Sequence, residues 1–139
     1  MGNTVQSHRD LKVWQKAMDL AVEIYRLAGT FPHSETYRLA AQITRAAASV
    51  PANIAEGHAR ATRRDFANFV AIAKGSRMEA ETFLMLPMRL DYLIENEASV
   101  AMGLITENSK MLTALRSRLV TGDKGVGSKE RNRGRGGPL

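Results

Sequence analysis

Apolar residues recur at helical spacing along most of the chain, beginning with residues 11–28. When these residues are placed at about 100° per position, the polar side chains separate from the apolar ones. The polar arc consists of Lys12, Gln15, Lys16, Asp19, Glu23 and Arg26. This pattern predicts an amphipathic helix over the segment.

The apolar face of this first helix is wider than a single bundle requires. Its apolar residues form two seams, one of Leu11, Trp14, Met18, Ala21, Tyr25 and Ala28 and the other of Val13, Ala17, Leu20, Ile24 and Leu27. Together the seams cover about 200°, whereas a stripe of about 100° is enough to bury one helix against a core. The surplus predicts an interface between subunits.

A second helix is predicted over residues 35–56, with Ser34 as its N-cap. Its inward positions are Leu39, Ile43, Ala47, Val50 and Ile54, and its opposite edge carries Arg38, Gln42, Arg45, Ser49, Asn53 and Glu56. Pro51 lacks an N–H and crowds the preceding turn, so we expect a kink there. Gly57 is expected to end the helix, in a left-handed conformation that glycine adopts easily.

Two further helices are predicted beyond Gly57. Thr62 followed by Asp65 resembles a capping box and opens a helix to about residue 94. Its inward seam is Phe66, Phe69, Ala73, Ser76, Ala80, Phe83, Pro87, Leu90 and Ile94. Asn96 is expected to cap a fourth helix over residues 97–120. The inward residues of that helix are Val100, Ala101, Leu104, Ile105, Met111, Leu112, Leu115 and Leu119.

Four long helices joined by short turns predict an all-α fold, an antiparallel up-down-up-down left-handed four-helix bundle over residues 10–120. The length of 139 residues suits one such domain. Residues 1–9 are expected to be a flexible N-terminus. Residues 121–139 are rich in Gly, Arg and Lys, which predicts a disordered basic tail.

Composition excludes several classes of protein. The chain has no Cys, so disulfides, thiolate zinc sites and cysteine nucleophiles are ruled out. It has neither an apolar signal core nor an apolar run of about 18 residues, so no membrane segment is expected. Both features favour a cytoplasmic protein.

Catalytic and metal-binding patterns are missing from the sequence. The histidines, His8, His33 and His58, fall in predicted termini or loops, and no two are four residues apart. No Glu-x-x-His repeat or Gly-rich phosphate loop occurs. We therefore expect no enzymatic activity, no metal and no cofactor.

Positive charge is concentrated in one part of the chain. The formal net charge is +6, and residues 38–77 contain seven basic side chains against two acidic ones. The basic ones are Arg38, Arg45, Arg60, Arg63, Arg64, Lys74 and Arg77. Such a segment favours an anionic partner, most commonly nucleic acid.

Three of these arginines, Arg60, Arg63 and Arg64, precede or begin the predicted third helix. Cations are unfavourable at that end of a helix dipole, whereas a bound anion is favourable there. The interpretation as a phosphate site and the interpretation as a solvated loop, offset by Glu56 and Asp65, are equally supported. The tail, with Arg131, Arg133 and Arg135, is either a nucleic-acid arm or a solubilising segment.

Between residues 10 and 120 the chain resembles the bacterial family of 23S ribosomal RNA intervening-sequence proteins. Residues 10–17 read DLKVWQKA, Phe31 and Pro32 follow, and residues 49–57 read SVPANIAEG. The likeness continues with Arg60, Arg63, Asp65, Phe66, Phe69, Gly75, Ser76, Glu79 and Glu81. The SVPANIAEG string is specific, although His58 stands where an aromatic residue is common.

The resemblance implies a bundle assembled as a homopentameric ring, without established enzymatic activity. A related branch, the accessory variability determinants of diversity-generating retroelements, associates with a reverse transcriptase and nucleic acid. An adaptor that binds RNA or DNA is therefore the leading hypothesis, with Arg38, Arg45, Arg60, Arg63 and Arg64 as candidate contacts. The alternative is a protein-interaction scaffold, with a reverse-transcriptase-like or other protein as its partner.

The family signature within SVPANIAEG is expected to be architectural. Its residues are Ser49, Pro51, Asn53, Glu56 and Gly57. Asn53 or Glu56 is expected to form a hydrogen bond across the following turn to the third helix.

Overall fold

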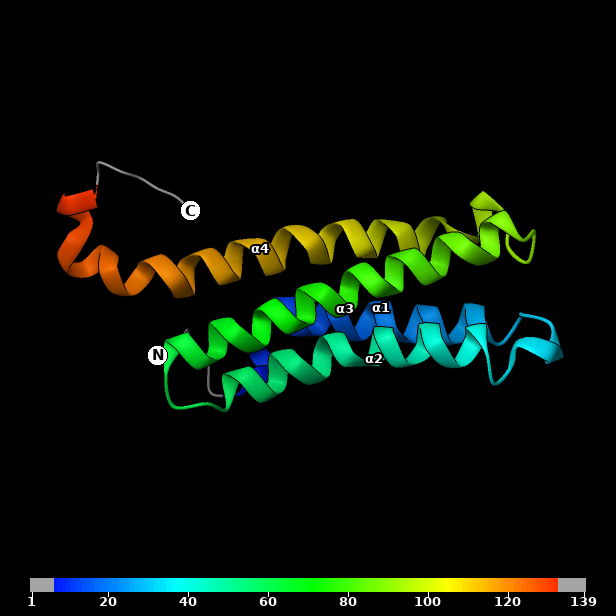
Figure 1. Ribbon diagram of the computed structural model, residues 1–139, viewed down its shortest axis with the longest axis horizontal. Helices are drawn as coiled ribbons and strands as arrows, with labels where there is room; N and C mark the ends of the chain where they lie inside the picture. The colour runs from blue at the N-terminus through cyan, green and yellow to red at the C-terminus, as the bar shows by residue number, and fades with distance from the viewer. Residues whose placement is uncertain (1–6, 133–139) are drawn as a thin grey trace.

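Four α-helices make up the fold in the computed structural model, which describes residues 7–132, with side chains up to Thr121. They are α1 (Lys12–Ala28), α2 (Leu39–His58), α3 (Arg63–Arg89) and α4 (Glu95–Asn132). The 3-10 helices η1 (His8–Asp10) and η2 (His33–Glu35) precede α1 and α2. Figure 1 shows the four long helices side by side, and each packs on two neighbours, with α1 closing onto α4. The predicted all-α four-helix fold is confirmed.

Helix α1 buries one of its two predicted apolar seams, the one of Val13, Ala17, Leu20, Ile24 and Leu27. Ala17, Leu20 and Ile24 are fully buried, and the other two residues are nearly so. On the other seam, Ala21 and Ala28 are buried, but Met18 and Tyr25 keep 39% and 56% of their surfaces exposed. The bundle therefore leaves part of the α1 apolar face uncovered, as the width of that face predicted.

Helix α2 differs from the prediction at both ends. It begins at Leu39, and the side chain of Glu35, rather than that of Ser34, accepts a hydrogen bond from the Leu39 N–H at 3.3 Å. It continues through Pro51 and ends at His58, so the predicted end at Gly57 is wrong. Gly57 has no positive φ angle and lies inside the helix, where the close packing of α3 requires a residue without a side chain.

Helix α3 begins as predicted but ends earlier. The Thr62 hydroxyl accepts the Asp65 N–H at 3.1 Å, which confirms the cap. The helix ends at Arg89 rather than near residue 94, because Asp91 adopts a positive φ of 64° and reverses the chain. Leu90 and Ile94, predicted to face inward, are consequently exposed.

Helix α4 is longer than predicted at both ends. It begins at Glu95, so Asn96 lies inside its first turn, and the Glu97 side chain accepts the Ile94 N–H at 2.9 Å instead. It extends to Asn132, beyond the predicted end at residue 120. No proline lies between residues 120 and 132 to interrupt the helix. The rest of the predicted tail, residues 133–139, lies outside the described residues.

The end of the predicted flexible N-terminus is structured. The Ser7 side chain caps η1, the His8 ring packs against the Trp14 ring at 5.0 Å, and Gln15 donates to the Arg9 carbonyl oxygen at 2.8 Å. These contacts tie η1 to α1 at residues 7–9. Residues 1–6 lie outside the described part of the chain.

A polar layer divides the core into two apolar clusters. One cluster includes Leu20, Ile24, Ile43, Leu84 and Ile105, and the other includes Val13, Val50, Ile54, Val70 and Leu112. Between them lie Ser49, Ser76, Arg77 and Asn108, which we call the polar waist. Asn108 is fully buried and donates to the carbonyl oxygens of Leu104 and Lys16, at 2.9 and 3.2 Å. The waist therefore links α4 to α1, and α2 to α3.

Within residues 7–132, none of the helices combines the length and the hydropathy needed to cross a bilayer.

Candidate nucleic-acid interface

Charge is distributed unequally between the two ends of the bundle. Residues 7–16, 50–73 and 107–121 form one half, with nine basic and four acidic side chains. Its basic residues are Arg9, Lys12, Lys16, Arg60, Arg63, Arg64, Lys110, Arg116 and Arg118. Residues 17–49 and 74–106 form the other half, with six basic and eight acidic side chains. We call these the basic half, with a formal charge of +5, and the acidic half, with −2.

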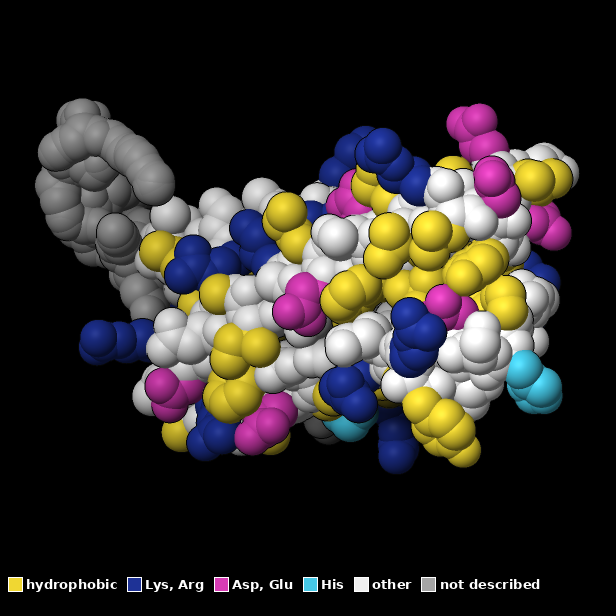
Figure 2. All heavy atoms as spheres, turned by 45° about the vertical axis from the view of Figure 1, so that its right-hand side comes forward, with side chains coloured by type: hydrophobic (Ala, Val, Ile, Leu, Met, Phe, Trp, Pro, Cys, Tyr) yellow, Lys and Arg dark blue, Asp and Glu magenta, His cyan; other side chains and the backbone are white. Residues whose placement is uncertain are grey.

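The two halves can be located in the figures. In Figure 1 the basic half lies toward the end that carries the α2–α3 turn. Figure 2 brings the opposite end forward and shows acidic side chains gathered at its tip. A polyanion would therefore meet a favourable potential at one end of the molecule.

The structure separates the five predicted contact residues into two groups. Arg60, Arg63 and Arg64 lie together at the α2–α3 turn, in the basic half. Arg38 directly precedes α2 and Arg45 lies in its second turn, and Arg38 is 3.9 Å from the Glu35 carboxylate. At 1.5 Å per residue, Arg45 is about 20 Å from Arg60 along the helix. The five therefore do not form one continuous patch.

Arg60 is held in place by two contacts. Its Nη2 donates to Oε2 of Glu56 at 2.9 Å, one helical turn earlier. Its Cζ lies 4.7 Å from the centroid of the Phe69 ring, a cation–π arrangement. The Arg60 side chain nevertheless stays 45% exposed. The guanidinium is thus fixed in orientation and accessible to solvent.

Phe69 is positioned by the close approach of α2 and α3. A Cβ on Gly57 would lie 2.7 Å from the Phe69 Cβ and 2.9 Å from the Phe66 Cδ1, distances that real Cβ atoms do not tolerate. The Phe66 ring also meets His58 edge to face, at 5.8 Å between centroids. The signature glycine therefore creates the packing that places Phe69 beneath Arg60.

Two arginines of α4 belong to the same end of the molecule and were not predicted. Arg63 Nη2 donates to the Arg118 carbonyl oxygen at 3.0 Å, and Arg116 Nε donates to the Ala67 carbonyl oxygen at 3.3 Å. Antiparallel pairing thus places residues 116–118 of α4 beside the start of α3. In the sequence, the only signal is that Arg116 and Arg118 lie off the apolar seam of the fourth helix.

Arg64 is exposed, as Arg60 and Arg63 are, but it makes no ion pair or hydrogen bond with the side chains described. It lies in the first turn of α3, where the helix N-terminus adds its own positive potential. It is the arginine of this cluster most available to a phosphate.

The signature residues make contacts within the bundle, but their hydrogen bonds differ from the prediction. Asn53 Nδ2 donates to the carbonyl oxygen and the Oγ of Ser49, at 2.8 and 2.9 Å, within α2. The bond to α3 is made by Ser49, whose Oγ lies 2.8 Å from the Ser76 Oγ. Glu56 pairs with Arg60 instead of reaching α3. The predicted cross-helix bond from Asn53 or Glu56 is wrong because both side chains find partners one turn away.

An apolar groove runs between α1 and α2 on the outside of the bundle. Its volume is about 580 Å³, and its lining includes Trp14, Met18, Val22 and Tyr25 from α1. The α2 side is formed by small or rigid residues, Ala48, Pro51, Ala52 and Ala55, and His8 closes one end. The α1 side of the groove is the part of that helix's apolar face that the bundle leaves uncovered, together with Val22.

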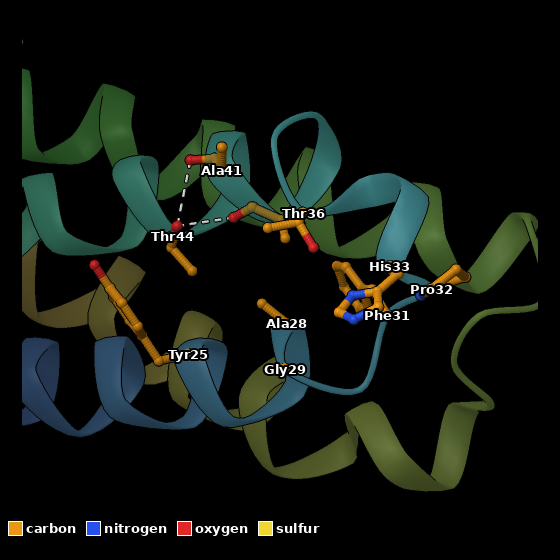
Figure 3. Close-up of a pocket in the computed structure, with 10 residues that line it drawn as sticks. Tyr25, Ala28, Gly29, Phe31, Pro32, His33, Thr36, Ala41 and Thr44 are labelled. Atoms are coloured by element: carbon orange, nitrogen blue, oxygen red, sulfur yellow. Dashed lines mark hydrogen bonds between the residues drawn. The ribbon is translucent and has the colours of Figure 1, made fainter.

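A smaller pocket of about 300 Å³ adjoins this groove at the α1–α2 turn (Figure 3). Tyr25 lines both hollows, and Phe31, His33 and Thr36 line the far side of the smaller one. The Thr44 hydroxyl donates to the backbone of its own helix, so its hydrogen is already used. The two hollows therefore extend one mainly apolar surface along α1 and α2.

Metal-ligating side chains are dispersed in the described residues. No three histidine, aspartate or glutamate side chains there come close enough to hold a metal ion.

Comparison with known proteins identifies relatives of this bundle. A family model described as 23S rRNA-intervening sequence protein matches residues 9–114. A crystal structure from Bacteroides thetaiotaomicron VPI-5482, described as a protein with unknown function from the S23 ribosomal protein family, is 28% identical. The match covers 75% of this chain and 97% of that one, with a TM-score of 0.70. No curated protein matches the chain.

Proposed function

Since the chain belongs to the 23S rRNA-intervening sequence protein family, we propose that it is a non-enzymatic, oligomeric cytoplasmic adaptor that binds RNA or DNA. The basic half of the bundle is the proposed binding surface. The observation that carries this proposal is the convergence of Arg60, Arg63 and Arg64 with Arg116 and Arg118, which come from a distant part of the chain.

The chemistry of this surface suits the nucleic-acid backbone. Guanidinium groups bind phosphate through paired N–H donors. Arg64 faces solvent at a helix N-terminus, where backbone N–H groups favour anions. Such contacts give affinity that depends on salt and little on sequence, because each neutralised phosphate releases counterions.

Self-assembly would strengthen this binding. The apolar groove leaves Met18, Val22 and Tyr25 exposed, with 39%, 66% and 56% of their surfaces accessible. Contiguous apolar surface of this kind marks interaction sites. A homo-oligomer, as a pentamer, would repeat the basic half five times and carry a formal charge of about +30, so weak phosphate contacts would act together.

A protein-interaction scaffold is the second candidate function. The same groove supports it, because an apolar channel with an alanine-lined side accepts a helix of another protein. In this alternative the partner is a reverse-transcriptase-like or other protein, and the positive charge serves solubility.

Filter binding to a structured RNA distinguishes the two functions. The intact protein should bind at about 50 mM salt and bind far more weakly at about 200 mM. Replacing Arg60, Arg63 and Arg64 together with alanine should lower both the affinity and the salt dependence. The matched control replaces Arg38 and Arg45 in the acidic half and should have a smaller effect. No binding of RNA or DNA by the intact protein at about 50 mM salt would favour the scaffold.

A further inference from the structure

We infer that the Arg60 guanidinium is a stacking platform for an unpaired nucleobase, so that the nucleic acid bound at the α2–α3 turn is single-stranded there. This inference rests on the proposed function and specifies the form of its ligand. The geometry around Arg60 separates it from the phosphate-binding arginines.

The plane of the Arg60 side chain is fixed before any ligand arrives. Glu56 holds one edge of the guanidinium through a 2.9 Å hydrogen bond. The Phe69 ring covers one side, with Cζ 4.7 Å from its centroid. Because 45% of the side chain stays exposed, the side away from Phe69 remains accessible. A flat group fixed on one side and open on the other is the arrangement on which bases stack.

The surroundings leave room for a base. Ala59 and Ala61 flank Arg60 in the turn, and both are small and exposed. Below them, Phe66 and Phe69 are half-buried and pack against Gly57. The platform therefore rests on the Phe69 ring, and the side chains next to it in the sequence are small.

The charge of Arg60 argues against a role as a phosphate contact. Its positive charge is offset by the Glu56 carboxylate, which would also repel an approaching phosphate. Stacking does not need a free charge, since it uses the planar face of the guanidinium. Arg64, which has no such carboxylate partner among the described side chains, is the better phosphate ligand.

The form of the nucleic acid follows from this geometry. Inside a duplex both faces of each base are covered by neighbouring bases, whereas an unpaired base can leave the strand and stack on a side chain. Loss of one such stacking contact weakens single-strand binding by roughly 5- to 150-fold. We therefore expect the protein to prefer RNA with an unpaired segment over a blunt duplex of equal charge.

The test uses the full chain with Arg60→Lys, which keeps the charge and the reach to Glu56 but removes the planar face. Affinity is measured by fluorescence anisotropy for a single-stranded RNA and a blunt RNA duplex at one salt concentration. Arg60→Lys should weaken single-strand binding by about tenfold and change duplex binding little. The matched control, Arg64→Lys, should change the ratio of the two affinities little.

A second variant and a second measurement distinguish a loss of the stacking contact from a loss of the fold. Phe69→Leu removes the ring beneath Arg60, and its thermal unfolding shows whether the bundle persists. 2-Aminopurine placed in the single strand should be quenched on binding to the wild type and less quenched with Arg60→Lys. Equal loss on single strand and duplex, or unchanged single-strand affinity and quenching, overturns the stacking role while nucleic-acid binding stands. A wild-type protein that binds neither RNA overturns both proposals.

Discussion

Tyr92, in the α3–α4 turn, donates its hydroxyl hydrogen to Oε2 of Glu35 at 2.9 Å, although the two residues are 57 positions apart. The other carboxylate oxygen of Glu35 accepts the Leu39 N–H at 3.3 Å and so caps α2. The Tyr92 ring also packs against Phe31, with 6.2 Å between centroids. One buried carboxylate thus joins the two turns at the acidic end of the bundle.

This hydrogen bond predicts a loss of stability at high pH. The bond to Glu35, with burial, raises the pKa of Tyr92 above its ordinary value of 10.0. A raised pKa means that the bond stabilises the fold fully below about pH 10 and that this contribution is lost as pH rises through the folded-state pKa. Tyr92→Phe should therefore melt below the wild type at pH 8, and the difference should shrink above pH 10. An equal difference at both pH values would contradict this role.

Replacing Gly57 with alanine should destabilise the bundle by about 1–3 kcal/mol, because the new Cβ overpacks against Phe66 and Phe69. Gly103 is the matched control, since a Cβ there meets no atom within 4 Å. Gly103→Ala should be neutral or stabilise by up to about 1 kcal/mol through helix propensity. Urea denaturation of the two variants measures the difference. If the free energy of unfolding rose to a similar extent in both variants, α2 and α3 would be able to move apart at Gly57 without an energetic cost.

The Ser49–Ser76 hydrogen bond predicts non-additive mutations. Each single change to alanine leaves the other hydroxyl, buried at Ser76 and half-buried at Ser49, without its partner in the opposite helix, and should cost about 1 kcal/mol. The double variant should lose less than the sum, because no hydroxyl is left unpaired. Free energies of unfolding for the four proteins give the coupling directly. Strict additivity would mean that the bond contributes nothing measurable.

Asn108 in the polar waist is expected to lower the free energy of unfolding while its hydrogen bonds fix the alignment of α4 with α1. Its Oδ1 is buried and has no hydrogen-bond partner among the described residues. Asn108→Leu should leave the free energy of unfolding unchanged or raise it by about 1 kcal/mol, because the desolvation cost disappears. The same change should broaden methyl NMR signals, since the bonds that align α4 with α1 are lost. Asn108→Ala is the control and should destabilise through a cavity. A Leu variant as unstable as the Ala variant would contradict this account.

The apolar groove predicts that the wild type self-assembles and that a charge placed in the groove weakens the assembly. Light scattering of the wild type at micromolar concentration should give a multiple of 15.3 kDa. Ala52→Glu places a charge in the groove and should shift the protein toward the monomer. Ala114→Glu, an equal change at an exposed position of α4, should not. A wild-type mass of 15.3 kDa would exclude the proposed oligomer.

The helical periodicity was sufficient to predict four helices and most of the core, because burial of one face repeats every few residues. It was insufficient where the role of a residue depends on a contact with another residue that is distant in the sequence. Gly57 was expected to end a helix, since local patterns cannot distinguish a terminating glycine from one that permits contact with Phe69. Arg116 and Arg118 lie at the candidate site because α3 and α4 pack antiparallel, and the sequence pattern alone does not show this pairing. The full burial of Asn108 also depends on that packing.

The unequal charge of the two halves of the bundle would act on the proposed nucleic-acid binding before any contact forms. A body that is positive at one end and slightly negative at the other experiences a torque in the field of a polyanion. It would therefore orient its α2–α3 turn toward the proposed nucleic-acid partner while the two are still separated by about a Debye length, roughly 8–10 Å at physiological salt. A larger fraction of collisions would then begin in the correct orientation. Added salt would abolish this alignment and slow association, even where the final contacts survive.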